Sequence, residues 1–287
     1  MEEQPAKSSR SPKPPLMLRF VRTLLRWLGH ITPNLAARLA YRLWFYPRRH
    51  PEPKREARWR ADAKHFTIPF QNEQLAAWRW GEGPVVLLVH GWDGRGNQLG
   101  SFAGPLVEAG YSAVAFDLPA HGLSTGKTTN MLNAADAICA VAESVGPIDA
   151  VIAHSFGAGA LARALAIGLR PAKAVMISPP ANLRWMADNF YRILGASIQV
   201  QRHIEKLVNE HYGVSIWQDV SADHNLRAIT IPGLIAHDIH DQEVPFAQSK
   251  LIEQVWSGAR LLETSGLGHR RILRDQKVIQ EVIDFIA

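Results

Sequence analysis

Beyond about residue 64, short runs of consecutive apolar residues alternate with longer stretches in which apolar residues recur at helical spacing. The first kind of run predicts a strand buried on both faces, and the second predicts an amphipathic helix. Such an alternation implies crossover connections, so the predicted fold class is α/β, with a mostly parallel sheet flanked by helices. We predict strands over 65–70, 75–80, 85–89, 112–117, 149–153, 173–178, 231–236 and 259–263, the first two as an antiparallel pair, and helices over 97–109, 130–144, 156–169 and 274–286.

The N-terminal part differs from the rest in both pattern and charge. Residues 1–15 are rich in proline, serine and lysine, which predicts a disordered basic tail. Residues 16–60 form an amphipathic helical extension, in which Arg19, Arg22 and Arg26 share one face. The net charge of +6 is uneven: residues 1–60 hold 14 lysines and arginines against 4 acidic residues (+10), and the remainder holds 18 against 22 (−4).

Two interpretations of the amphipathic extension stay open. Residues 16–46 lie on an anionic membrane with their arginines at the headgroups, or they pack on the rest of the protein with their arginines in solvent. No recognition motif accompanies the charge, so nucleic acid is not expected as a partner. Because no apolar run spans a bilayer and no signal peptide is evident, we expect a cytoplasmic protein, in the first interpretation one peripheral to the inner membrane surface. The single cysteine, Cys139, excludes an intramolecular disulfide.

The segment Ala153-His154-Ser155-Phe156-Gly157 joins a predicted strand to a predicted helix. Small residues two positions before and two after Ser155 allow the sharp bend that projects a serine hydroxyl from the edge of a sheet. Ser155 also lies at a helix N-terminus, where unpaired N–H groups favour developing negative charge. The pattern predicts a nucleophile elbow, although a plain helix N-cap has the same local sequence.

An acid and a histidine follow later predicted strands. Asp238 and Asp241 come shortly after the strand over 231–236, and His269 follows the strand over 259–263. In open α/β sheets the reactive groups gather beyond the carboxyl ends of the strands, so Ser155, one of these acids and His269 can converge there. The order serine, acid, histidine is typical of a catalytic triad.

These motifs, together with His90-Gly91-Trp92 and the segment 117–124, resemble the α/β-hydrolase superfamily, and in particular its bacterial esterases and lipases. The resemblance extends over roughly residues 64–287, and its main departure is Ala153 in place of the commoner first glycine of the elbow. It implies that residues 61–183 and 230–287 form the hydrolase core. The insertion over 184–229, which interrupts the alternation with aromatic and charged residues, would be a short helical cap.

The resemblance also implies roles for individual residues. Ser155 would be the nucleophile and His269 the general base, and the family pattern selects Asp241 over Asp238 because it places the acid three residues before the Val-Pro pair. The backbone N–H groups of Trp92 and Phe156 would form the oxyanion hole.

The expected function is that of a serine hydrolase that cleaves a carboxylic ester or thioester through an acyl-enzyme, with a small ester or acyl compound as its partner. The alternatives are an acyltransferase or cofactor-free perhydrolase that uses the same triad, and a non-catalytic, membrane-associated binding protein on a hydrolase scaffold. No phosphate or dinucleotide fingerprint and no metal-ligand spacing is present, so no cofactor and no metal are expected. The acyl chain length and the oligomeric state are not decided by the sequence.

Overall fold

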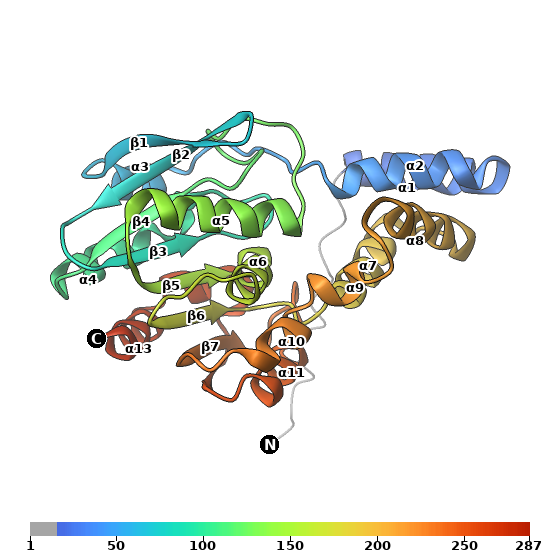
Figure 1. Cartoon of the computed structure of the whole chain (residues 1–287). Coiled ribbons are helices and arrows are strands. Elements are labelled where there is room, and N and C mark those ends of the chain that lie inside the picture. Colours follow the sequence, from blue (N-terminus) through green and yellow to red (C-terminus); the bar gives the residue numbers. More distant parts are fainter. Residues whose placement is uncertain (1–15) are drawn as a thin grey trace, which may run out of the picture.

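A computed structural model describes residues 16–287, and its centre is one eight-stranded sheet (Figure 1). The strand order is β1-β2-β4-β3-β5-β6-β7-β8, in which β1 and β2 run antiparallel to their neighbours and the other strands are parallel. The predicted α/β class and mostly parallel sheet are therefore confirmed. The strands are β1 (Lys64–Phe70), β2 (Glu73–Trp80), β3 (Val85–Val89), β4 (Ser112–Phe116), β5 (Ile148–His154), β6 (Lys173–Ile177), β7 (Gly233–Asp238) and β8 (Ala259–Thr264).

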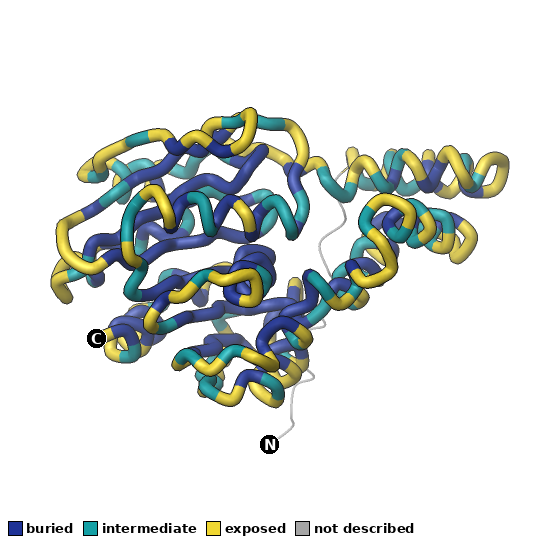
Figure 2. The backbone as a smooth tube through the Cα atoms, in the orientation of Figure 1, coloured by how far each residue is buried: buried dark blue, intermediate teal, exposed yellow. Residues whose placement is uncertain are grey.

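Successive residues of β3 explain why its sequence is apolar throughout. Leu87 packs into one hydrophobic cluster with α5 (Met131–Val145) and α6 (Phe156–Ala166), and Leu88 packs into a second cluster with α4 (Ala103–Glu108) and α13 (Gln276–Ile286). Helices thus cover both faces of the sheet. Figure 2 shows that the strands are the most continuously buried part of the molecule. Burial on both faces leaves no solvent side on which polar residues would alternate.

Two predicted elements differ in detail from the structure. The helix predicted over 97–109 begins as a 3₁₀ helix (Gly96–Phe102) and becomes α-helical only in α4. The strand predicted over 231–236 is shifted to β7, because Pro232 has no N–H to donate and regular pairing starts at Gly233. The shift makes Asp238 the last residue of the strand, whereas Asp241 lies in the loop beyond it.

Four α-helices and a short 3₁₀ helix (Leu226–Ala228) fill the chain between β6 and β7. The side chains of Asn182 and Ser197 accept hydrogen bonds from backbone N–H groups and so cap the N-termini of the first two helices, and Gly195 ends the first of them in the left-handed conformation. These helices are α7 (Leu183–Leu194), α8 (Ile198–Tyr212), α9 (Ile216–Asp219) and α10 (Ala222–Asn225).

The N-terminal extension forms a helical hairpin that packs against α7 and α8 (Figure 1). Its first helix, α1 (Leu16–Ile31), lies against α7 and its second, α2 (Pro33–Trp44), lies along α8. The contact is close, since a Cβ on Gly29 would lie 3.1 Å from Val200. The structure therefore contains the packing that the second interpretation of the extension requires. The predicted tail over 1–15 lies outside the described residues.

A third helix, α3 (Lys54–Arg60), ends the extension and packs on the 3₁₀ helix that follows β3. Across residues 16–287, no helix combines the length and the apolar character needed to cross a membrane.

Candidate active site

Ser155 lies at a strained turn between β5 and α6. Its φ of +53° is in a region that non-glycine residues rarely adopt, as expected of a nucleophile elbow. Its N–H donates to the carbonyl of Ile177 on β6, which anchors the turn to the sheet. Gly157 is required, because a Cβ at that position would lie 2.3 Å from the carbonyl oxygen of His90. Phe156 is the first residue of α6, so its N–H has no acceptor within the helix.

His269 and Asp241 form a buried hydrogen-bonded pair. The Nδ1 of His269 lies 2.7 Å from Oδ2 of Asp241, and the Asp241 side chain is fully buried. The backbone N–H groups of Glu243 and Val244 donate to the other oxygen, Oδ1, at 2.8 and 2.9 Å. Because a carboxylate only accepts, Nδ1 of His269 carries the proton and Nε2 is free to accept one.

The rival acid, Asp238, is occupied elsewhere. It is also buried, but it accepts hydrogen bonds from the N–H groups of His240 and Leu267 and from the hydroxyl of Thr264. Burial alone would raise the pKa of Asp238, and these bonds to its ionised form lower it instead. Asp238 thus holds the loops after β7 and β8 together, and Asp241 is the acid that contacts His269.

A second histidine, His237, contacts the same carboxylate and was not expected from the sequence. Its Nε2 lies 2.9 Å from the carbonyl of Val244 and 3.3 Å from Oδ2 of Asp241, and its Nδ1 lies 2.6 Å from the hydroxyl of Ser249. Since the carbonyl only accepts, Nε2 carries the proton, and Ser249 donates to Nδ1. Burial alone would raise the pKa of Asp241, but the hydrogen bonds from His237 and His269 hold it far below its usual range.

The turn after β3 lies directly against the elbow. A Cβ on Gly91 would be 3.0 Å from Cβ of Ser155, so a larger residue there would press on the serine. Trp92 follows, and its ring meets the ring of Phe156 edge-on at 5.0 Å between centroids. The backbone of residues 91–92 and the first residue of α6 therefore flank Ser155, which is the arrangement that an oxyanion hole needs.

The remaining polar residues of the motifs serve the loops around the site. His90 accepts from the N–H of Leu118, and Asp117 accepts from the N–H groups of Gly96 and Leu123. Burial raises the pKa of Asp117 to about 6, against the effect of these two bonds. The His154 ring lies tilted against the ring of His269, with 4.6 Å between the centroids, and Nε2 of His154 donates to the carbonyl oxygen of His269.

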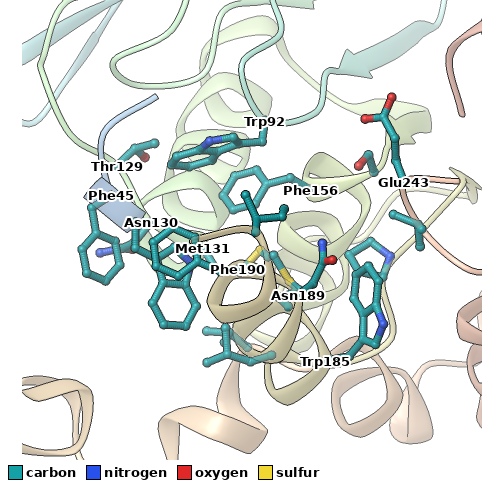
Figure 3. Close-up of a pocket in the computed structure, with 18 of the residues that line it drawn as sticks. Phe45, Trp92, Thr129, Asn130, Met131, Phe156, Trp185, Asn189, Phe190 and Glu243 are labelled. Carbon is teal, nitrogen blue, oxygen red and sulfur yellow. The ribbon is translucent and has the colours of Figure 1, made fainter. Parts of the chain in front are cut away.

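A cavity of about 430 Å³ opens on Ser155 and His269. Figure 3 shows part of its lining, with Trp92, Phe156 and Phe190 around it. Its walls are mostly apolar and come from the helices between β6 and β7, from the start of α5 and from the N-terminal extension. Trp44 at the end of α2 stacks on Phe190 of α7, with 5.1 Å between ring centroids. The extension thus builds one wall of the cavity through Leu43, Trp44 and Phe45, which the sequence pattern did not indicate.

The segment after α2 is tied to the loops that surround the site. Phe45 accepts from the N–H of Thr129, and Arg48 forms a salt bridge with Asp93 at 2.8 Å. Arg49 donates to three backbone carbonyls of the loop after β4, those of Ala120, Ser124 and Gly126.

The chain matches the model of the alpha/beta hydrolase family over residues 86–281, and it belongs to this family. A non-heme haloperoxidase of Rhodococcus erythropolis is 29% identical over 238 residues, a match that covers 66% of this chain and 87% of the relative. Among solved structures, an esterase of Pyrococcus furiosus has a TM-score of 0.65 at 20% identity and covers 84% of this chain and 98% of its own. A bacterial membrane phospholipase A has a TM-score of 0.64 at 16% identity, covering 94% and 96%. The fold is therefore that of the family, and its members support a hydrolase activity in general.

The two acids at the end of β7 provide a matched test of the site. We expect Asp241→Asn to lower kcat by about 10⁴-fold, because an amide in place of the carboxylate favours the wrong tautomer of His269. Asp238→Asn replaces one of the carboxylate oxygens that accept hydrogen bonds from the loops after β7 and β8. It should cost about 1–3 kcal/mol of folding free energy, with kcat changed less than about tenfold. Ester hydrolysis and urea unfolding of both variants measure the two effects. Equal losses of kcat in both would show that Asp241 has no special role.

The close approach of Gly91 to Ser155 gives a second prediction. Gly91→Ala should displace the backbone that carries the N–H of Trp92 and lower kcat by about 10²-fold, the usual cost of one oxyanion donor. The control is Gly104→Ala in α4, where an added Cβ meets no atom within 4 Å and should stabilise the helix by about 0.5–1 kcal/mol. Unchanged kcat in folded Gly91→Ala would argue against this N–H as an oxyanion donor.

Proposed function

We propose that the protein is a serine hydrolase that cleaves a carboxylic ester or thioester through an acyl-enzyme on Ser155. One observation carries the proposal: the elbow serine and His269, which is hydrogen-bonded to the buried Asp241, line the same apolar cavity. A serine hydroxyl is a weak nucleophile by itself, and a histidine held in one tautomer by a buried carboxylate is the usual means of activating it.

In the first half of the reaction, Oγ of Ser155 attacks the carbonyl carbon of the substrate while Nε2 of His269 takes the hydroxyl proton. The carbonyl oxygen becomes an oxyanion, which the N–H groups of Trp92 and Phe156 stabilise. Asp241 stays ionised and stabilises the imidazolium, since its pKa lies far below neutral pH. The tetrahedral intermediate collapses with loss of the alcohol or thiol, to which His269 returns the proton.

In the second half, His269 removes a proton from a water molecule, which attacks the ester bond between the acyl group and Ser155. The second tetrahedral intermediate releases the carboxylic acid and restores the serine hydroxyl. Two histidines and two backbone N–H groups on Asp241 keep the acid oriented through both halves of the cycle. His237 would act here as a positioning residue.

The cavity favours an apolar acyl group of medium length. Its volume of about 430 Å³ and its aromatic and aliphatic walls suit a chain longer than acetate. Each methylene that leaves water for such a wall contributes about 0.8 kcal/mol to binding.

A second candidate is perhydrolysis, in which hydrogen peroxide replaces water and the acyl-enzyme is released as a peracid. The similarity to a protein named as a non-heme haloperoxidase supports this candidate. The two activities share the acyl-enzyme and differ in the acceptor. Product analysis with peroxide and water in competition therefore separates them.

Labelling with a fluorophosphonate tests the nucleophile directly. We expect one covalent adduct on the intact protein, none on Ser155→Ala, and labelling slowed by several orders of magnitude in His269→Ala, because the histidine activates the serine. Intact mass spectrometry measures the adduct. No adduct on the folded wild-type protein would contradict the proposal and favour a non-catalytic binding protein.

Substitution in the cavity wall tests the acyl pocket. Met186→Trp on α7 should fill part of the cavity and lower kcat/KM for an octanoate ester by at least about tenfold, as expected when about 1.4 kcal/mol of apolar burial is lost. The acetate ester of the same alcohol is the control and should change little. A parallel loss on both esters would mean that the acyl chain does not occupy this cavity.

A further inference from the structure

One face of α1 is apolar and exposed although the opposite face is packed. Leu16, Phe20, Trp27 and Ile31 are 61–79% exposed, and Leu24 between them is 37% exposed. On a helix these positions fall within a sector of about 100°, so they form one continuous stripe. We call Leu16, Met17, Phe20, Leu24, Trp27 and Ile31 the α1 stripe.

The packed face explains why α1 is held with this stripe outward. Leu25 and Gly29 are buried on the opposite side, where α1 meets α2 and the cap helices. Arg22 donates to the carbonyl of Ile193 on α7. Figure 1 places the hairpin at the outer edge of the molecule, beside α7 and α8 and away from the sheet. The stripe is therefore presented by a helix that is already fixed to the body.

The charges beside the stripe are all positive. Arg19 and Arg26 are exposed and occupy the adjoining sector of α1, and Arg38 and Arg42 are exposed on α2. The whole segment 4–51 contains ten lysines and arginines and no acidic residue. A surface that accepts both the stripe and this charge must be apolar below and anionic above, which describes the headgroup layer of an anionic bilayer.

We propose that the α1 stripe docks the protein on the surface of an anionic lipid bilayer. The apolar side chains enter the boundary between headgroups and acyl chains, while Arg19 and Arg26 contact lipid phosphates. The docking helix and the cavity wall belong to one hairpin, because Leu43 and Trp44 are the last residues of α2 and Phe45 follows them. Docking would therefore hold the proposed acyl pocket near the membrane. Binding of the protein to the bilayer does not itself depend on the proposed hydrolysis.

Two other occupants of the stripe fit the observations less well. Residues 1–15 contain Met1 as their one large apolar side chain, so they offer little apolar surface to cover it. A second copy of the chain would bring two acid-free, arginine-bearing helices together, and their like charges would repel each other.

Vesicle co-sedimentation tests the proposal with the full-length protein. The vesicles contain phosphatidylglycerol and phosphatidylcholine, or phosphatidylcholine alone. We expect the wild type to bind the anionic vesicles and Phe20→Ser/Trp27→Ser to bind them at least about tenfold more weakly, since two large apolar side chains are lost. Arg19→Gln/Arg26→Gln should bind about 25-fold more weakly, since each arginine near an anionic surface contributes about fivefold.

The control is Ile167→Ser/Leu251→Ser, which removes two apolar side chains that are 43% and 39% exposed and lie outside the hairpin. This variant should bind like the wild type. Thermal unfolding shows that each variant is folded, and light scattering measures the oligomeric state without lipid. Absence of wild-type binding, or equal binding by all variants, would overturn the proposal. If the wild type is a dimer and Phe20→Ser/Trp27→Ser is a monomer, the α1 stripe is the contact between two copies of the chain. That result would overturn the membrane proposal as well.

Discussion

The bent backbone at Ser155 is the constraint on which the site depends. A non-glycine residue in this conformation costs about 1–3 kcal/mol, so its surroundings must hold it. The hydrogen bond to Ile177 joins the turn to β6, and the contact between Gly157 and the carbonyl of His90 joins it to the end of β3. These two anchors fix the serine, the start of α6 and the backbone of Gly91 relative to one another. The geometry around Ser155 therefore follows from the packing of the central strands and not from any loop alone.

The acid side of the site is built with the same redundancy. Asp241 lies in the loop beyond β7, which by itself would be free to move, but four donors converge on its carboxylate. One of them, His237, belongs to the strand and is itself held by Ser249 on α11 (Ala247–Val255). A loop residue thereby acquires the rigidity of the sheet. Asp238 adds to this by tying the loops after β7 and β8 to each other.

Much of the fold and of the candidate site could be predicted from the sequence. The features that the sequence did not predict were missed for physical reasons. Unbroken apolar runs marked the parallel strands. Ser155, His269 and the two acids Asp238 and Asp241 were singled out because each follows a predicted strand, and the family pattern then selected Asp241. His237 was missed because a histidine within a buried strand leaves no periodic signal, and its role depends on contacts with Val244 and Ser249 that only the fold creates. The place of the extension was left open because packing and membrane contact both require an amphipathic helix. In the structure one side of α1 is buried and the other is exposed, so a single helix has an apolar residue for each environment.

The wall contributed by Leu43, Trp44 and Phe45 has a consequence for how substrate preference can evolve in this protein. The segment that matches the family begins at residue 86, so it contains the proposed catalytic groups but not this wall. Mutations in the hairpin can reshape the pocket without disturbing the elbow or the Asp241–His269 pair. One part of the proposed substrate pocket is thus encoded outside the stretch that contains the proposed catalytic groups. Relatives that share the matched segment but carry another N-terminal extension should differ in substrate preference sooner than in the type of reaction.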